Sequence, residues 1–106
     1  MGLVMVTVWF PPTKGIDIAK KAIEALKKFP ADESIAIQLA QGLASDRQGF
    51  KSITISEVKE GKLEEALDRA NEIVDFYTEI EGVTYKMDLM VTPQEAYARI
   101  GMKPPE

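Results

Sequence analysis

Residues 3–10 read LVMVTVWF and are followed directly by Pro11-Pro12. β-Branched and aromatic residues dominate the stretch, which predicts a β-strand that ends at the prolines. Alternate residues of a strand point to opposite faces, and here both faces are apolar. The two sets are Val4, Val6, Val8 and Phe10 on one face and Leu3, Met5, Thr7 and Trp9 on the other. Such a strand is typical of the centre of a sheet that is covered on both sides.

The residues after this strand change to a helical period. Apolar side chains recur at helical spacing, namely Ile18, Ala19, Ala22, Ile23, Leu26 and Phe29. Asp17 or Thr13 can cap the start of this helix, and Pro30 ends it.

Two alternating stretches and a second helix follow. Residues 34–44 and 50–58 alternate as strands, and the polar segment 45–49 connects them as a loop or hairpin. Gly61 precedes an amphipathic helix that ends at Glu81-Gly82, and residues 83–91 alternate as a fourth strand. Thr92-Pro93-Gln94-Glu95 has the form of a capping box and predicts a short helix to about Ile100, closed by Gly101, before a loose tail.

This βαββαβ order predicts an α+β, ferredoxin-like domain with a four-stranded antiparallel sheet. The 106 residues suffice for one domain, with its core in residues 3–91 and a short C-terminal helix and tail in 92–106.

The composition excludes several chemistries. The chain has no cysteine and no histidine, so disulfides, Cys-ligated metals and histidine-ligated haem are ruled out. Its net charge of −4 is unfavourable for nucleic-acid binding, and no apolar run is long enough to span a membrane. The carboxylates of the second helix are spread along several turns, so we predict no metal site and no cofactor. We expect a cytoplasmic protein.

The strand alternation assigns residues to the two faces of the sheet. We expect the bulky sets beneath the helices, namely Val4/Val6/Val8, Ile35/Ile37/Leu39, Ile53/Ile55 and Tyr85/Met87/Leu89. The face without helices, called the open face below, then carries Leu3, Met5, Thr7, Trp9, Ala36, Gln38, Ala40, Ser52, Thr54, Ser56, Lys86, Asp88 and Met90. Because the first strand is apolar on both faces, the sequence leaves open which of its faces the helices cover.

An open face of this mixed kind suits a second sheet with a cavity between the two. An exposed patch of Leu, Met and Trp is otherwise an association site, and two-fold dimers are the commonest oligomers. We therefore expect a homodimer. The chain opens with an apolar strand that ends in Trp9-Phe10-Pro11-Pro12, with Lys14-Gly15 before the first helix.

With these features, residues 3–91 resemble the dimeric α+β barrel superfamily, in which two ferredoxin-like protomers pack sheet to sheet. The resemblance implies a dimeric α/β barrel. Cofactor-independent monooxygenases of that superfamily use a tryptophan, an asparagine and a histidine. This chain has Trp9, no histidine, and a single asparagine, Asn71, on the second helix.

Candidate site residues come from the open face. Met5, Thr7, Trp9, Gln38, Thr54 and Lys86 are candidates to contact a small hydrophobic ligand. Asp88 is the candidate acid or base, because a carboxylate in a partly apolar cavity can exchange protons. An ion pair of Lys86 with Asp88, packing of Trp9 in a dimer interface and solvated hydroxyls are the structural alternatives.

The first functional hypothesis is a small-molecule-binding protein, or a cofactor-independent enzyme acting on a hydrophobic metabolite. The second is a non-catalytic regulatory or protein-interaction module. A third, an RNA-binding ferredoxin-like domain, needs paired aromatics on the first and third strands, where the third strand instead has Ser52, Thr54 and Ser56.

Overall fold

The computed structural model describes residues 2–103 and confirms the ferredoxin-like order. The elements are β1 (Leu3–Phe10), the 3₁₀ turn η1 (Pro12–Lys14), α1 (Gly15–Lys28), β2 (Ala36–Asp46), β3 (Gly49–Val58), α2 (Leu63–Tyr77), β4 (Thr84–Met90) and α3 (Pro93–Arg99). The predicted tail falls partly on residues 104–106, which lie outside the described residues.

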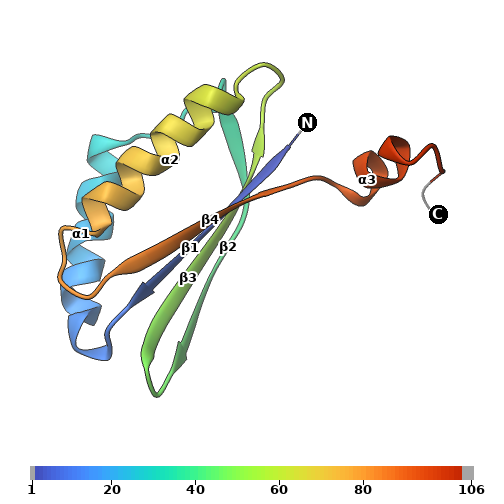
Figure 1. Ribbon diagram of the computed structural model, residues 1–106. Coiled ribbons are helices and arrows are strands. Elements are labelled where there is room, and N and C mark those ends of the chain that lie inside the picture. The colour runs from blue at the N-terminus through green and yellow to red at the C-terminus, as the bar shows by residue number, and fades with distance from the viewer. Residues whose placement is uncertain (1, 104–106) are drawn as a thin grey trace.

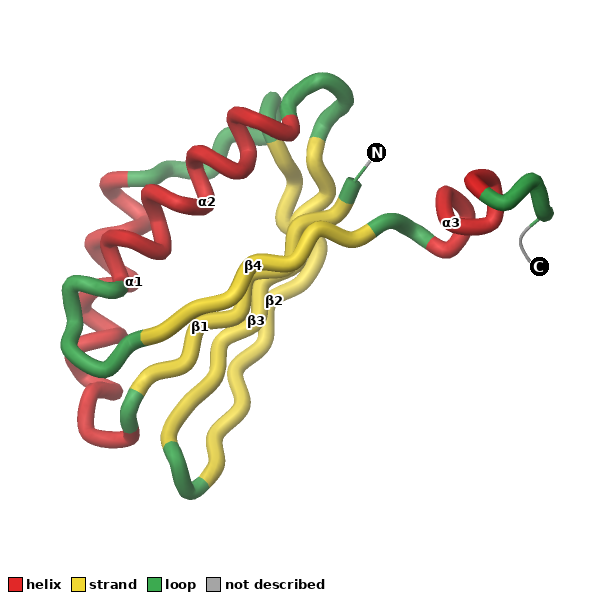
Figure 2. The backbone as a smooth tube through the Cα atoms, in the orientation of Figure 1, coloured by secondary structure: helices red, strands yellow, loops and turns green. Residues whose placement is uncertain are grey.

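The four strands form one antiparallel sheet in the order β2-β3-β1-β4. β1 is central, as its two apolar faces predict. Helices α1 and α2 both lie on one side of the sheet, which we call the covered face (Figures 1 and 2). The other side is the open face, with no helix packed across it in either view.

The core lies between the covered face and the helices. Val4 of β1, Val58 of β3 and Ala66 of α2 are buried together, and Val6 and Leu67 pack against them. Val74 of α2 is the most completely buried large side chain in the described chain, at 1% exposure. The covered face of β1 is therefore the set with Val4 and Val6, which settles the question that the sequence leaves open.

The helix α1 differs from the prediction at its start. It begins at Gly15, and neither Asp17 nor Thr13 caps it; the capping position is Lys14, whose side chain makes no capping hydrogen bond. The reason is the turn η1, in which Lys14 N donates to Pro11 O at 3.0 Å. The chain therefore enters the helix from a turn that is already hydrogen-bonded.

The buried side of α1 is also rotated from the predicted arc. Ala25 is buried, whereas Ile23 and Leu26 are 58% and 75% exposed. Contacts with α2 set this rotation: Phe29 meets Phe76 edge to face at 5.8 Å between ring centroids, and Lys21 Nζ lies 4.0 Å from the centroid of Phe76. α1 therefore turns its Lys21 side toward α2 and leaves an apolar stripe exposed.

Strand β2 begins two residues later than predicted and runs to Asp46. A turn at Asp32 delays it, because Ile35 N and Ala36 N both donate to Asp32 O, at 3.1 and 3.2 Å. The strand also carries an irregularity between Gln38 and Ala40, where its pairing with β3 shifts by one residue. Beyond this bulge, the alternation of β2 is inverted relative to a regular strand.

The C-terminal helix forms as predicted. Thr92 caps α3, with Glu95 N donating to Thr92 Oγ1 at 3.2 Å. The helix closes at Gly101, which has a positive φ of 73° and donates to Ala98 O at 3.1 Å. α3 lies well away from the sheet and the other helices (Figure 1), and none of its residues is buried.

Candidate functional site

The open face differs from the predicted one along β3. Directly opposed residues of antiparallel strands share a face. Val4, Val6 and Val8 of the covered face oppose Ser56, Thr54 and Ser52, whereas Met5 and Thr7 of the open face oppose Ile55 and Ile53. The prediction that Ile53 and Ile55 lie beneath the helices is therefore wrong.

Two residues at the ends of β3 explain its orientation. Phe50 stacks on Phe10 with ring centroids 5.3 Å apart, and Val58 is 3% exposed within the core. Phe50 and Val58 are an even number of residues from Ser52, Thr54 and Ser56, so all five point to the covered face. We call Phe50 and Val58 the end anchors of β3. A strand turned over would move Phe50 and Val58 out of the core at once. These anchors outweigh the two isoleucines between them.

The pairing of β2 with β3 also places two residues of β2 on the faces opposite to those predicted. Gln38 opposes Ser56 and so lies on the covered face, while Ile37 opposes Glu57 on the open face. The faces predicted for Gln38 and Thr54 are thus both wrong. Leu39 lies at the bulge and is 54% exposed.

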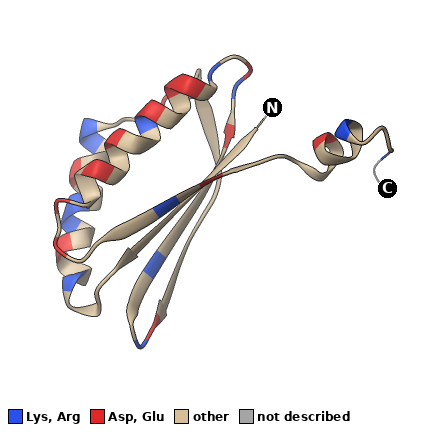
Figure 3. Cartoon of the chain, in the orientation of Figure 1, with Lys and Arg blue, Asp and Glu red and all other residues tan. Residues whose placement is uncertain are grey.

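The open face is consequently more apolar than the sequence analysis predicts. Its apolar side chains come from all four strands, and they are Leu3, Met5, Trp9, Ile37, Ile53, Ile55 and Met90. Small residues of β2, Ala40, Gly42 and Ala44, complete this side. Figure 3 shows that charged residues gather on the helices and are sparse along the strands.

Five charged residues belong to the open face. Asp46 opposes Gly49 at the hairpin end of β2 and is held in the turn, and the other four are separated by sign. Lys51 opposes Trp9, and Lys86 opposes Thr7, so both lysines lie toward the C-terminal end of β1. Glu57 opposes Leu3, and Asp88 opposes Met5, toward the N-terminal end of β1. Lys86 and Asp88 form an ion pair at 3.6 Å on β4.

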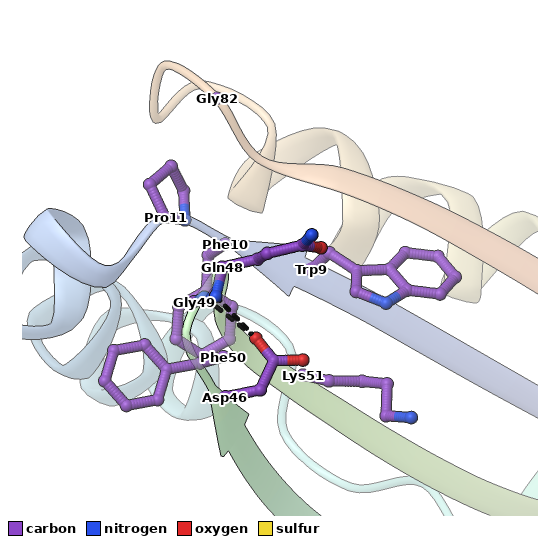
Figure 4. Close-up of a pocket in the computed structure, with 9 residues that line it drawn as sticks. All are labelled: Trp9, Phe10, Pro11, Asp46, Gln48, Gly49, Phe50, Lys51 and Gly82. Carbon is purple, nitrogen blue, oxygen red and sulfur yellow. Dashed lines mark hydrogen bonds between the residues drawn. The ribbon is translucent and has the colours of Figure 1, made fainter.

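A hollow of about 390 Å³ lies where β1 ends beside the β2–β3 hairpin. Its walls include Trp9, Pro11, Gln48, Lys51 and Gly82 (Figure 4). Trp9 and Lys51 point to the same side, away from the Phe10 and Phe50 rings. Trp9 is 40% exposed, so a large aromatic surface is available beside this hollow.

The hairpin holds the hollow in shape. Asp46 Oδ1 accepts hydrogen bonds from Gln48 N at 2.7 Å and from Gly49 N at 3.1 Å. This carboxylate is therefore engaged in the turn. Within residues 2–103, Lys51 forms no ion pair, and Lys51 and Asp46 both line the hollow.

The structure brings together only part of the predicted site. Met5, Thr7, Trp9, Lys86 and Asp88 lie on the open face, and Thr7 is 5% exposed beneath its neighbours. Their roles in ligand binding stay predictions. The residues that sequence reasoning missed are Lys51 and Gln48. The sequence did contain a signal for Lys51. Phe50 and Val58 are large apolar residues that share one face of β3, so Lys51 must lie on the other face.

The arrangement limits the chemistry of Asp88. Its carboxylate pairs with Lys86, and it opposes Met5, four residues before Trp9 on β1. It does not line the hollow. In the part of the chain that the structure describes, His, Cys, Asp and Glu side chains form no group of three able to hold a metal ion.

No family model matches the sequence, and no curated protein matches it significantly. Within residues 2–103, no helix has the length and apolar character needed to cross a bilayer.

Proposed function

We propose that the protein is a homodimer that packs two open faces together and binds a small hydrophobic molecule beside Trp9. One observation carries the proposal: the face that no helix covers holds isoleucine, leucine, methionine and tryptophan from four strands. A continuous apolar patch of this kind marks an interaction site. Two sheets packed face to face in this way correspond to a dimeric α/β barrel.

The hollow beside Trp9 supports the binding part of the proposal. Its volume of about 390 Å³ is within the range of small-molecule sites. An aromatic wall with a few polar groups, here Gln48 and Lys51, is typical of such sites. We place binding ahead of catalysis, because the candidate acid or base Asp88 lies outside the hollow and is paired with Lys86.

Sedimentation equilibrium tests the dimer. A mass that follows a monomer–dimer equilibrium supports the proposal, whereas a monomer at all concentrations contradicts it.

Fluorescence tests the binding site, because Trp9 is the single tryptophan of the chain. The probe is 1-anilinonaphthalene-8-sulfonate, which fluoresces when it binds apolar surface. Energy transfer from Trp9 to the bound probe is expected. Trp9→Leu should weaken probe binding, measured by the probe's directly excited emission. Tyr85→Leu is the matched control, because Tyr85 is 41% exposed but opposes Val8 on the covered face. Equal effects of the two variants would contradict a site at Trp9.

A second candidate function is a non-catalytic interaction module. The apolar stripe of α1 favours it, since Ile16, Ile23 and Leu26 are 74%, 58% and 75% exposed. A monomer in sedimentation that also shows no energy transfer would favour this function over the first.

A further inference from the structure

The open face can be described as four rows that run across β3, β1 and β4. From the N-terminal end of β1, the rows are Glu57–Leu3–Met90, Ile55–Met5–Asp88, Ile53–Thr7–Lys86 and Lys51–Trp9–Thr84. The middle of the four rows lies at the level of Val6, which opposes Thr54 and Met87. The open face is thus centred on one position along the strands.

Two copies can meet through this face with their strands antiparallel or parallel. A two-fold axis across the strands reverses the order of the rows, so that the first row of one copy meets the fourth row of the other. A two-fold axis along the strands brings each row against the same row of the other copy. The charges on the face distinguish these two arrangements.

In the antiparallel arrangement the charges are complementary. Lys51 faces Glu57 of the partner subunit, and Lys86 faces Asp88 of the partner subunit. Symmetry repeats each contact, because a residue pair across a two-fold interface occurs twice. Lysine and glutamate side chains together can span the separation of about 10 Å between packed sheets.

The uncharged side chains of the face also match in this arrangement. Trp9 lies over Leu3 of the partner subunit, and Ile53 lies over Ile55 of the partner subunit. On β2, Ile37 shares the row of Glu57, and Ala44 shares the row of Lys51, so a large side chain meets a small one. Aligned sheets keep their strand directions within about 30° of each other, so the displacement is smallest for the middle rows, where Ile53 and Ile55 lie.

The parallel arrangement lacks this complementarity. Each row then meets the same row of the other copy, so the lysine end of one face lies against the lysine end of the other. Like charges placed together across an interface are unfavourable. Lys51 and Glu57 lie at opposite ends of the face, and this separation therefore favours the antiparallel orientation.

We infer that the second copy packs on the open face with its strands antiparallel, and that Lys51–Glu57 and Lys86–Asp88 ion pairs across the interface set this orientation. The inference rests on the proposed dimer and adds the geometry of its interface. It also implies that the hollow beside Trp9 is completed by the partner, because the start of the partner's β1 lies over Trp9.

Charge reversal provides the first test. Lys51→Glu places two carboxylates against each other in both symmetric contacts, and we expect the dimer dissociation constant to rise about tenfold. Glu57→Lys should do the same. The double variant K51E/E57K exchanges the two charges and should return the dissociation constant to within about threefold of the parent. Lys27→Glu, an exposed change on α1 with the same charge difference, is the control and should have no effect.

Cross-linking provides a second test. The chain has no cysteine of its own, so only the introduced cysteines can react. A short bis-maleimide should join protomers of the double variant K51C/E57C, but not of K51C or E57C alone. Linkage within one chain is excluded, because positions 51 and 57 lie roughly 20 Å apart on one strand at about 3.4 Å per residue.

The outcomes separate this inference from the proposed dimer. A dimer that tolerates both single reversals, or that cross-links through K51C alone, would overturn the antiparallel orientation and leave the dimer standing. A parent protein that sediments as a monomer would overturn both.

Discussion

The covered face and the open face of the sheet are built from the same strands but hold different kinds of side chain. On β3 the covered face carries Ser52, Thr54 and Ser56, and the open face carries Ile53 and Ile55. The helices therefore cover the more polar side of this strand. The difference shows that the ends of a strand, here Phe50 and Val58, can determine its orientation against the preference of its middle.

The largest expected effect comes from placing the same charge on either side of β3. Thr54→Asp places a carboxylate at a half-buried position that faces the helices and should lower the free energy of unfolding by about 3 kcal/mol. Ile55→Asp should leave the unfolding free energy of the monomer within about 0.5 kcal/mol, but raise the dimer dissociation constant at least about 100-fold. Urea denaturation at low protein concentration and sedimentation equilibrium measure the two quantities.

If Ile55→Asp lowered the unfolding free energy and Thr54→Asp raised the dimer dissociation constant, the two faces of β3 would be the reverse of those described. Ser52→Asp is a further check on the covered face, and it should resemble Thr54→Asp in both measurements.

Gly49→Ala should weaken the hairpin that orients β3. Gly49 has φ of +140°, which other residues rarely adopt, and an added Cβ would collide with the carbonyl oxygen of Phe10. We expect a loss of about 3 kcal/mol in unfolding free energy, measured by urea denaturation. Gly42→Ala is the matched control, because a Cβ at Gly42 meets no atom within 4 Å. Equal losses would contradict the strain argument.

Val74→Ala tests the core beneath the covered face without touching the open face. Val74 is 1% exposed, and removing two buried methyl groups should cost about 2 kcal/mol of unfolding free energy. The dimer dissociation constant should stay unchanged. A change in dimerisation equal to that of Ile55→Asp would argue against separate roles for the two faces.

A smaller effect is expected from alkaline pH. Burial raises the pKa of the Tyr77 hydroxyl above its ordinary value of 10.0. The unfolded chain therefore loses this proton at lower pH than the folded chain, so stability should fall as pH rises above about 10 and be unaffected below it. Tyr77→Phe should reduce this decline, measured by urea denaturation between pH 9 and 11. An identical decline in the parent and in Tyr77→Phe would show that deprotonation of Tyr77 does not cause it.

Much of the fold could be predicted from the sequence, because each element has a strong local signal. The period of LVMVTVWF, the prolines after it and the Thr92–Glu95 capping box each depend on neighbouring residues alone. The face of β3 could not be read from its alternation, since the decisive contacts, Phe50 with Phe10 and Val58 with Val4, join distant parts of the chain. The shift in β2 at Gln38 and Ala40 likewise depends on pairing with β3.

The candidate site was predictable to the same extent. Met5, Thr7 and Trp9 lie on the open face because the parity of β1 was read correctly. Gln38 and Thr54 were misplaced, since their faces depend on the bulge and on the end anchors. Lys51 was missed for the same reason, and with it the separation of charge along the face.

The central position of β1 has a consequence for synthesis of the protein. Leu3 pairs with Met90 on one side and with Glu57 on the other, so β1 gains its last neighbour only after β4 has been synthesised. Contacts between residues so distant in sequence slow folding, and an unpaired apolar strand is prone to aggregate meanwhile. One edge of this apolar strand therefore stays unpaired from the synthesis of β1 until the synthesis of β4.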